Sequence, residues 1–582
     1  MTPKDPIRTK TPHPCRTRGA EKPQEGAAKA VWEAARAMLS GLPGGAGVNI
    51  AHEAVDRHAA GPLQHRTAFR WIGESGDVQE LTYGRLAALT SRFANGLAAL
   101  GIERGDRVFA CADRIPELYI AAIGALKHGA VFCPLFSAFG PEPLYQRLER
   151  GDARALLTTG RIYRRKIAPL LPRLPRLQHV ILADAAAEGT IAYPRFLDAA
   201  PDVYTIAPTD PEDPALLHFT SGTSGMPKGA LHVHGAVVAH YATGAHVLDL
   251  RDGDLFWCTA DPGWVTGTIY GLITPLVMGV TSIIDAGPFD AVRWMRLLSE
   301  QGVTVWYTSP SAIRRLMRLP PGAVRKEDFR RLRHILSVGE PLPPDAVAWG
   351  REVLDRTIHD TWWQTETGAI MVANVPGRPV RPGSMGMPIP GVTATVLQEG
   401  EAGAVGVVQD PETAGELGLA VGWPSMFRAY LGEPERYERC FSGGWYRSGD
   451  LVRRDADGYF WFVGRKDDII KTSGQMVGPF EVERLLLSHP SVADAGVIGK
   501  PDAMLGESVK AFVVLKSGIR PDDESRRELI AFSRKNLGAA IAPREIEFIS
   551  SIPRNRAGKV MRRLLKARET GGAAGDTSTL AE

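Results

Sequence analysis

A stretch of ten residues, TSGTSGMPKG at 220–229, is rich in groups that could hold phosphate. Its three glycines leave backbone amides accessible, and its four hydroxyl side chains are further donors to anionic oxygen. The phosphate loop of ATPases and GTPases requires G-x-x-x-x-G-K-[ST]. Here Pro227 stands in place of the second glycine, and Gly229 follows Lys228 instead of a hydroxyl residue. The stretch therefore predicts a polyphosphate cradle of a different kind.

Four further polar or glycine-rich stretches follow along the chain. They are DTWWQTETG (360–368), YRSGD (446–450), GRKDDIIKTSG (464–474) and PRNRAGKVMRR (553–563). Together with the first stretch they resemble the adenylate-forming superfamily of acyl-CoA synthetases, peptide-synthetase adenylation domains and firefly luciferase. DPGWVTG (261–267), SVGEPL (337–342) and DTWWQTETG resemble its acetyl-CoA synthetase branch, and the C-terminal GDTSTL resembles the shorter bacterial form of that branch. The resemblance runs from about Asn49 to Lys566.

This resemblance implies an AMP-forming acid–thiol ligase that uses ATP, Mg²⁺ and coenzyme A. A short carboxylate would become acyl-AMP with release of pyrophosphate, and its acyl group would then pass to CoA with release of AMP. Because carboxylate and triphosphate are both anionic, the first step needs positioning and charge cancellation rather than an enzyme nucleophile. The family match makes Lys559 the bridging cation. It makes Thr365 a donor to the α-phosphate and Glu366 the Mg²⁺-associated carboxylate.

The resemblance also assigns residues to the nucleotide and to CoA. Asp450 would accept both ribose hydroxyls, and Arg465 would contact the ribose or a phosphate. Ser473 and Gly474 would lie beside the pantetheine path. The complete set of expected cofactor-binding residues is Thr220, Ser221, Gly222, Thr223, Ser224, Gly225, Lys228, Gly339, Glu340, Pro341, Asp360, Thr361, Trp362, Gln364, Asp450, Arg465, Ser473 and Gly474.

Trp363 bears on the size of the acid. In the family an indole at this position closes the carboxylate pocket, whereas a glycine opens it to longer chains. Trp264, Val265, Thr266 and Val338 match the other walls. A surplus methylene would overpack a closed pocket at a cost of about 1–3 kcal/mol. We therefore expect acetate as the substrate, with propionate as a possible second acid.

Two other functions stay open at this point. The chain could load an adenylated acid onto the phosphopantetheine of a carrier protein, although the sequence shows no carrier domain. It could also be a non-catalytic nucleotide-binding relative, because Met476 stands where relatives commonly carry a basic residue that touches phosphate. ATP-dependent AMP release, measured with a panel of short acids with and without CoA, would separate the three.

The motif residues require a scaffold, and the rest of the chain predicts an α/β fold. Short apolar stretches alternate with helical ones, among them DRVFACA (106–112), ARALLTT (153–159), HVILADA (179–185) and TSIID (281–285). We expect a large N-terminal domain of β-sheets layered with helices at 27–464. A small, mobile α+β C-terminal domain at 465–566 would follow, with a hinge near Asp467. The remaining segments, 1–26 and 567–582, are expected to be tails.

Composition excludes several other classes. The net charge of +4 comes from 69 basic and 65 acidic residues, and aromatic residues do not alternate with basic runs, so nothing points to nucleic acid. No stretch reaches 18 uninterrupted apolar residues, which excludes a membrane-spanning helix, and we expect no membrane partner. The five cysteines lie far apart, as expected for a cytoplasmic protein. Acetylation would delete the Lys559 charge, so a lysine acetyltransferase and a deacetylase are possible partners.

Overall fold

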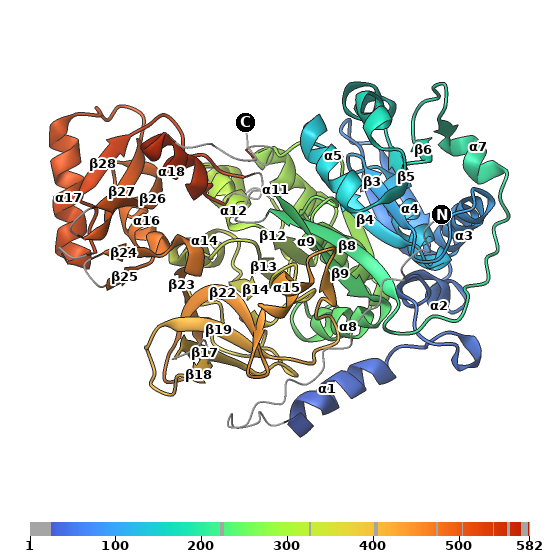
Figure 1. The fold of residues 1–582 in the computed structure, drawn as a ribbon, viewed down its shortest axis with the longest axis horizontal. Helices are drawn as coiled ribbons and strands as arrows, with labels where there is room; N and C mark the ends of the chain where they lie inside the picture. The colour runs from blue at the N-terminus through green and yellow to red at the C-terminus, as the bar shows by residue number, and fades with distance from the viewer. Residues whose placement is uncertain are drawn as a thin grey trace.

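The computed structural model describes residues 25–221, 226–324, 327–400, 405–472, 475–502, 505–538, 541–555, 559–571 and 580. Within these residues the chain forms four sheets. Three belong to a large lobe, and the fourth, with helices α16 to α18, forms a smaller lobe at the upper left of Figure 1. This is the expected α/β fold with an additional α+β C-terminal part.

An eight-stranded sheet carries the first motif. Its order is β20 (Ala429–Tyr430), β9 (Pro227–Val233), β8 (Pro214–Ser221), β4 (Val131–Leu135), β3 (Arg107–Cys111), β5 (Ala153–Thr158), β6 (His179–Leu182) and β7 (Ile191–Ala192). The strands from β4 to β7 are parallel. Their near-continuous apolar sequences are typical of strands that are buried on both faces. Strands β8 and β9 pair antiparallel, and the phosphate-type stretch forms the connection between them.

A nine-stranded sheet carries the motifs SVGEPL (337–342) and DTWWQTETG (360–368). Its order is β16 (Met387–Pro388), β15 (Val372–Ala373), β14 (Ile358–Trp362), β13 (His334–Ser337), β12 (Val305–Thr308), β10 (Leu255–Cys258), β11 (Thr281–Asp285), β1 (Thr67–Ile72) and β2 (Val78–Thr82). Strands β14, β13, β12 and β10 are parallel. SVGEPL and WWQTETG stand at the carboxyl ends of the adjacent parallel strands β13 and β14, so they lie at the same edge of the sheet. Ligand sites of such sheets lie beyond the carboxyl ends of the strands.

A six-stranded sheet completes the large lobe. Its strands are β18 (Val405–Val407), β17 (Ala394–Glu399), β19 (Gly415–Ala420), β22 (Trp445–Arg454) and β21 (Phe441–Ser442), with β23 (Phe460–Arg465) paired to β22. The antiparallel register of β22 and β23 sets Asp450 opposite Arg465. Asp450 and Arg465, which lie on two successive strands, thus become direct neighbours.

The small lobe is a five-stranded sheet covered by helices. Its strands are β25 (Gln475–Val477), β24 (Ile470–Thr472), β27 (Gly506–Leu515), β26 (Val492–Asp502) and β28 (Glu545–Phe548), and its helices are α16 (Pro479–Leu487), α17 (Asp523–Leu537) and α18 (Arg562–Thr570). The short 3₁₀ segment Lys466–Asp468, which contains the expected hinge residue, joins this lobe to β23. Asp467 is exposed there.

Both ends of the chain differ in detail from the expected tails. Helix α1 begins at Glu25, and α18 continues past Lys566 to Thr570, with Glu569 on its last turn paired with Lys510 at 2.5 Å. Leu580 forms an isolated bridge with Asn555. Residues 1–24 and 572–579 lie outside the described part of the chain.

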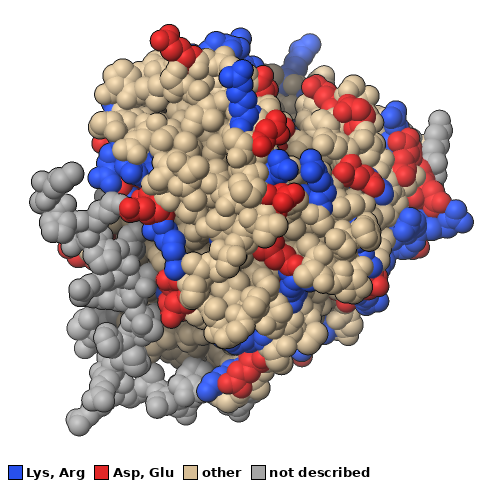
Figure 2. All heavy atoms as spheres, turned by 90° about the vertical axis from the view of Figure 1, so that its right-hand side faces the viewer, with Lys and Arg blue, Asp and Glu red and all other residues tan. Residues whose placement is uncertain are grey.

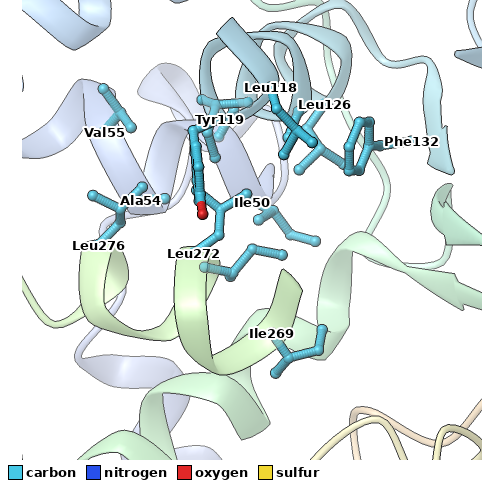
Figure 3. Packing of buried hydrophobic residues seen from close by; sticks show 14 of the residues in the cluster. Ile50, Ala54, Val55, Leu118, Tyr119, Leu126, Phe132, Ile269, Leu272 and Leu276 are labelled. Atoms are coloured by element: carbon cyan, nitrogen blue, oxygen red, sulfur yellow. The ribbon is translucent and has the colours of Figure 1, made fainter. Parts of the chain in front are cut away.

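An extensive hydrophobic cluster lies in the large lobe. Figure 3 shows a part of it, where Tyr119, Leu118 and Leu126 of helix α4 (Pro116–His128) face Leu272 and Leu276. The same cluster contains Tyr270 and Tyr307, and Trp363 packs against it. The walls of the expected acid pocket therefore rest directly on the core.

The surface carries mixed charge. On the face drawn in Figure 2, basic and acidic residues are interspersed, with no broad area of one sign. This matches the small net charge of +4. Among the described residues, no helix has the length and apolar character that crossing a membrane would require.

Candidate active site

Strands β8 and β9 bring the two ends of the first motif together. Thr220 pairs with Lys228 across this hairpin. Residues Gly222, Thr223, Ser224 and Gly225 lie outside the described residues, as do Ser473 and Gly474, and for Ser221 only the main chain is described. The Lys228 ammonium lies 5.2 Å from the ring centre of Tyr430. Burial lowers the pKa of Lys228, and the nearby Glu366 carboxylate opposes that effect.

Glu366 lies in the turn between β14 and β15 and is held by Tyr430. The Tyr430 hydroxyl donates to Glu366 Oε1 over 2.6 Å, and the Phe427 amide donates to the main-chain oxygen of Glu366 over 2.9 Å. Tyr430 therefore contacts both an expected phosphate lysine and the expected magnesium carboxylate. Tyr430 could not be found from the motifs, because no spacing in the sequence relates it to either partner.

Two buried histidines lie next to the same turn. His240 Nε2 lies 3.1 Å from the main-chain oxygen of Gly368, and His232 Nδ1 lies 3.1 Å from that of Ser425. Gly368 has a φ of +65°, and a Cβ on it would come within 2.8 Å of the His232 ring, so only glycine fits. Burial lowers the pKa of His232 to about 4, which keeps the ring neutral. The histidines therefore pack the turn without adding charge to it.

Asp450 is buried and accepts three hydrogen bonds. Trp362 Nε1 and Gln364 Nε2 donate to its Oδ2, each over 2.9 Å, and Arg465 Nη1 donates to its Oδ1 over 2.7 Å. A carboxylate offers about four lone-pair sites, so it retains capacity for a further donor on the Oδ1 side. Gln364 is itself fixed, because Tyr446 donates to its Oε1 over 2.7 Å. The Asp450 charge raises the pKa of Arg465, which stays a cation.

The expected cofactor-binding segment Gly339–Pro341 is flanked by contacts to a buried carboxyl. Ser337 donates to Asp360 Oδ1 over 2.6 Å, and the Leu342 amide lies 3.4 Å from Oδ2. Gly339 makes the turn between them at φ +98°. Glu340, just before Pro341, accepts from Arg314 over 2.7 Å. Burial raises the pKa of Asp360 to about 7, so this group is protonated at mildly acidic pH.

Three of the five expected pocket residues share one hydrophobic cluster. Val265, Val338 and Trp363 all contact the large core cluster, with Thr266 half-buried beside Val265 at the start of α9 (Val265–Thr268). Trp264 does not join them. Its ring packs on Phe136 and Phe139 in a second cluster, with centroid distances of 5.4 and 6.0 Å. Trp264 has extended backbone angles, φ −105° and ψ 153°, so its side chain diverges from that of Val265.

The Lys559 side chain is affected by charged groups of both lobes. Its amide donates to Asn555 Oδ1 over 2.8 Å, which closes the loop that carries it. The residue retains exposed surface, yet the protein around the amine lowers its pKa, and the Arg465 charge lowers it further. Asp468 and Asp450 act in the opposite direction. The amine therefore lies within electrostatic reach of the Asp450–Arg465 pair.

The donor set fits a magnesium ion carried in with a nucleotide. Tyr430 bonds one oxygen of the Glu366 carboxylate, and the second can coordinate a hard cation. Mg²⁺ is commonly bound through one or two carboxylates plus substrate phosphates. Within the described residues no group of three or more His, Cys, Asp or Glu side chains could hold a metal alone, so any ion here would depend on phosphate oxygens.

Comparisons with known proteins show what the chain resembles. Residues 55–431 match the family model described as AMP-binding enzyme, and residues 481–559 match the AMP-binding enzyme C-terminal domain. The acetyl-coenzyme A synthetase of Bacillus subtilis (strain 168) is 45% identical over 92% of this chain and 92% of its own length. That of Methanothrix thermoacetophila is 38% identical over 92% of this chain and 85% of its own length.

Solved structures give the same picture. An acyl-CoA synthetase of Brucella canis is 35% identical with a TM-score of 0.71, over 93% of this chain and 97% of that one. An anthranilate CoA ligase in complex with anthranoyl-AMP is 27% identical with a TM-score of 0.81, over 90% of this chain and 97% of that one.

Proposed function

The chain belongs to the AMP-binding enzyme family, and within it to the acetyl-coenzyme A synthetases, and on this premise we propose that it joins acetate to coenzyme A while ATP is converted to AMP and pyrophosphate. One observation carries the proposal. The amine of Lys559, on the small lobe, lies within electrostatic reach of Asp450 and Arg465, on the large lobe. This supports Lys559 as the cation that would lie between the carboxylate and the α-phosphate.

The first step forms a bond between an acetate oxygen and the α-phosphorus of ATP. The bond from that phosphorus to the bridging oxygen of pyrophosphate breaks, and pyrophosphate leaves with the electron pair. Lys559 would neutralise the repulsion between the two anions, and Thr365 would donate to the α-phosphate. Asp450 would hold the ribose, with Arg465 fixing its carboxylate. Bound Mg²⁺ would supply positive charge at the β- and γ-phosphates, held on the chain by Glu366.

The second step exchanges AMP for the thiol of CoA. The thiol sulfur attacks the acetyl carbon, AMP leaves with its bridging oxygen, and the thiol proton passes to solvent. Lys559 is not needed for this step, so the small lobe can rotate away. We place its boundaries at 465–566 and its hinge at Asp467, which the exposed 3₁₀ segment Lys466–Asp468 supports. Closure during the first step would protect acetyl-AMP from water.

The acid pocket would be closed by Trp363. Trp363 packs against the buried core, which includes Val338 and also contacts Val265, and this supports a small rigid pocket. Extra methylenes would meet packed side chains rather than solvent, so butyrate should be rejected sharply. A missing methylene forfeits only about 0.8 kcal/mol, so acetate and propionate should differ mildly. Propionate is therefore the proposed second substrate.

Two further proposals concern the cellular setting. We place the enzyme in the cytoplasm, where ATP and CoA are available. We also propose that acetylation of Lys559 by a lysine acetyltransferase switches adenylation off, and that a deacetylase restores it, because acetylation deletes the charge. The exposed position of Lys559 supports access by such enzymes. Normal exchange of labelled pyrophosphate into ATP by Lys559-acetylated protein would contradict this switch.

The function is tested by AMP release with a panel of acids from formate to hexanoate, with and without CoA. We expect CoA-dependent AMP formation that is fastest with acetate, slower with propionate and very slow with butyrate. Release that requires a carrier protein in place of CoA would favour the loading enzyme instead. Absence of AMP with every acid would favour the non-catalytic relative.

A further inference from the structure

The indole of Trp363 is held by a chain of hydrogen bonds that starts at its only polar atom. Trp363 Nε1 donates to the hydroxyl oxygen of Tyr307 over 3.2 Å. The Tyr307 hydroxyl lies 2.8 Å from Thr361 Oγ1, and Thr361 Oγ1 donates to the main-chain oxygen of Ser337 over 2.7 Å. The chain therefore ties the indole to strands β12, β14 and β13 in succession.

The direction of every bond in this chain follows from the groups at its two ends. An indole nitrogen can only donate, and a carbonyl oxygen can only accept. Thr361 has one hydroxyl hydrogen and gives it to Ser337, so it must accept from Tyr307. The Tyr307 hydroxyl in turn donates to Thr361 and accepts from the Trp363 indole. Each hydroxyl hydrogen in this chain has one acceptor, so a single orientation of the indole satisfies all of these hydrogen bonds.

A second tyrosine holds the ring of Trp363 without bonding its nitrogen. The rings of Tyr270 and Trp363 meet edge to face, 5.1 Å between centroids at 82°. The hydroxyl of Tyr270 accepts from the Ile370 amide over 2.8 Å and donates to Thr243 over 3.0 Å. Tyr270 and Tyr307 are both fully buried. Tyr270 therefore supplies packing to the indole, whereas Tyr307 supplies the polar anchor.

We propose that Tyr307 determines chain-length specificity by fixing the pose of the Trp363 indole. It acts as a positioning residue, since it contacts the wall of the pocket rather than the acid. The inference rests on the proposed function, in which Trp363 closes the acid pocket. Without the Tyr307 hydroxyl the indole loses its only hydrogen bond and can tilt or rotate. The wall then yields to a longer acid that the anchored ring rejects.

The test is the Tyr307→Phe variant, which keeps the ring and removes the anchor. AMP formation is measured as kcat and KM for acetate, propionate and butyrate. We expect kcat/KM for propionate and butyrate, each divided by that for acetate, to rise roughly three- to tenfold, mainly through KM. The KM for ATP should stay the same. Tyr270→Phe is the matched control, because it also loses a buried hydroxyl but should leave both ratios unchanged.

A double substitution identifies the route of the effect. Trp363→Phe removes the indole N–H, so adding Tyr307→Phe to that background should produce no further change in either ratio. If Tyr307→Phe folds poorly, Thr361→Val removes the acceptor that orients Tyr307 and should raise the ratios in the same direction. Unchanged ratios, or an equal change in the Trp363→Phe background, would overturn the inference. A wild type that forms no AMP with any short acid would instead refute the proposed function, and this inference with it.

Discussion

The buried carboxyl of Asp360 should make the stability of the large lobe depend on pH in an unusual direction. Burial raises its pKa from the ordinary 3.8 to about 7. Between these values the folded protein retains the proton, while the unfolded chain has released it. The free energy of unfolding should therefore fall as the pH rises from about 4 to 7 and level off above 7. Most protein carboxylates act in the opposite direction.

The size of the effect follows from the same two pKa values. Their difference corresponds to roughly 4 kcal/mol, of which roughly 3 kcal/mol falls between pH 5 and pH 8. A lobe of about 440 residues has an unfolding entropy near 0.9 kcal/mol/K. The Asp360 contribution should therefore lower the melting temperature by about 3 °C across that range.

Calorimetry of the wild type and Asp360→Asn at several pH values isolates this contribution. Asparagine cannot titrate. The melting temperature of the variant, relative to that of the wild type, should therefore rise by about 3 °C between pH 5 and pH 8. Asp345→Asn, in the exposed first turn of α14 (Pro344–Val353), controls for the loss of one negative charge. A gap between wild type and Asp360→Asn that stays constant over this range would refute the reasoning.

Three further substitutions test separate parts of the site. Trp363→Gly should lower kcat/KM for acetate and gain medium-chain acids in an AMP-release assay; loss of activity with no longer substrate gained would contradict the closed pocket. Tyr430→Phe should lower kcat/KM for ATP about tenfold at limiting Mg²⁺, because Glu366 loses its hydroxyl donor. Tyr437 does not contact Glu366, so Tyr437→Phe should leave kcat/KM for ATP unchanged. Equal effects of the two substitutions would argue against the proposed role of Tyr430. Asp467→Pro should stiffen the hinge and slow acyl transfer to CoA while pyrophosphate exchange continues; equal slowing of both steps would exclude a hinge.

The sequence was most informative where motif residues lie at strand ends. SVGEPL and DTWWQTETG were expected to act together, and the parallel strands β13 and β14 bring them to one edge. Asp450 and Arg465 were both assigned to the nucleotide, and strand register makes them partners. Short, regular elements preserve such relations, because a strand fixes which residues share an edge.

The supporting residues could not be predicted, because their contacts are tertiary. Tyr430 and Glu366 are 64 positions apart, and His232 and Ser425 are 193 apart, so no local spacing links them. The direction of a side chain was equally hidden. Trp264 stands next to Val265 in the sequence, yet its backbone angles turn it into a different cluster. Residues such as these are fixed by packing between elements, which a single sequence does not specify.

The most direct test of the central claim compares the two half-reactions of Lys559→Ala. Exchange of labelled pyrophosphate into ATP reports adenylation, and CoA-dependent release of AMP from supplied acetyl-AMP reports thiolysis. We expect exchange to be nearly abolished while thiolysis keeps most of its rate, and Arg568→Ala, a distant base paired with Glu547 at 2.8 Å, to affect neither. Equal loss of both half-reactions in Lys559→Ala would contradict the assignment of this lysine to charge cancellation in the first step.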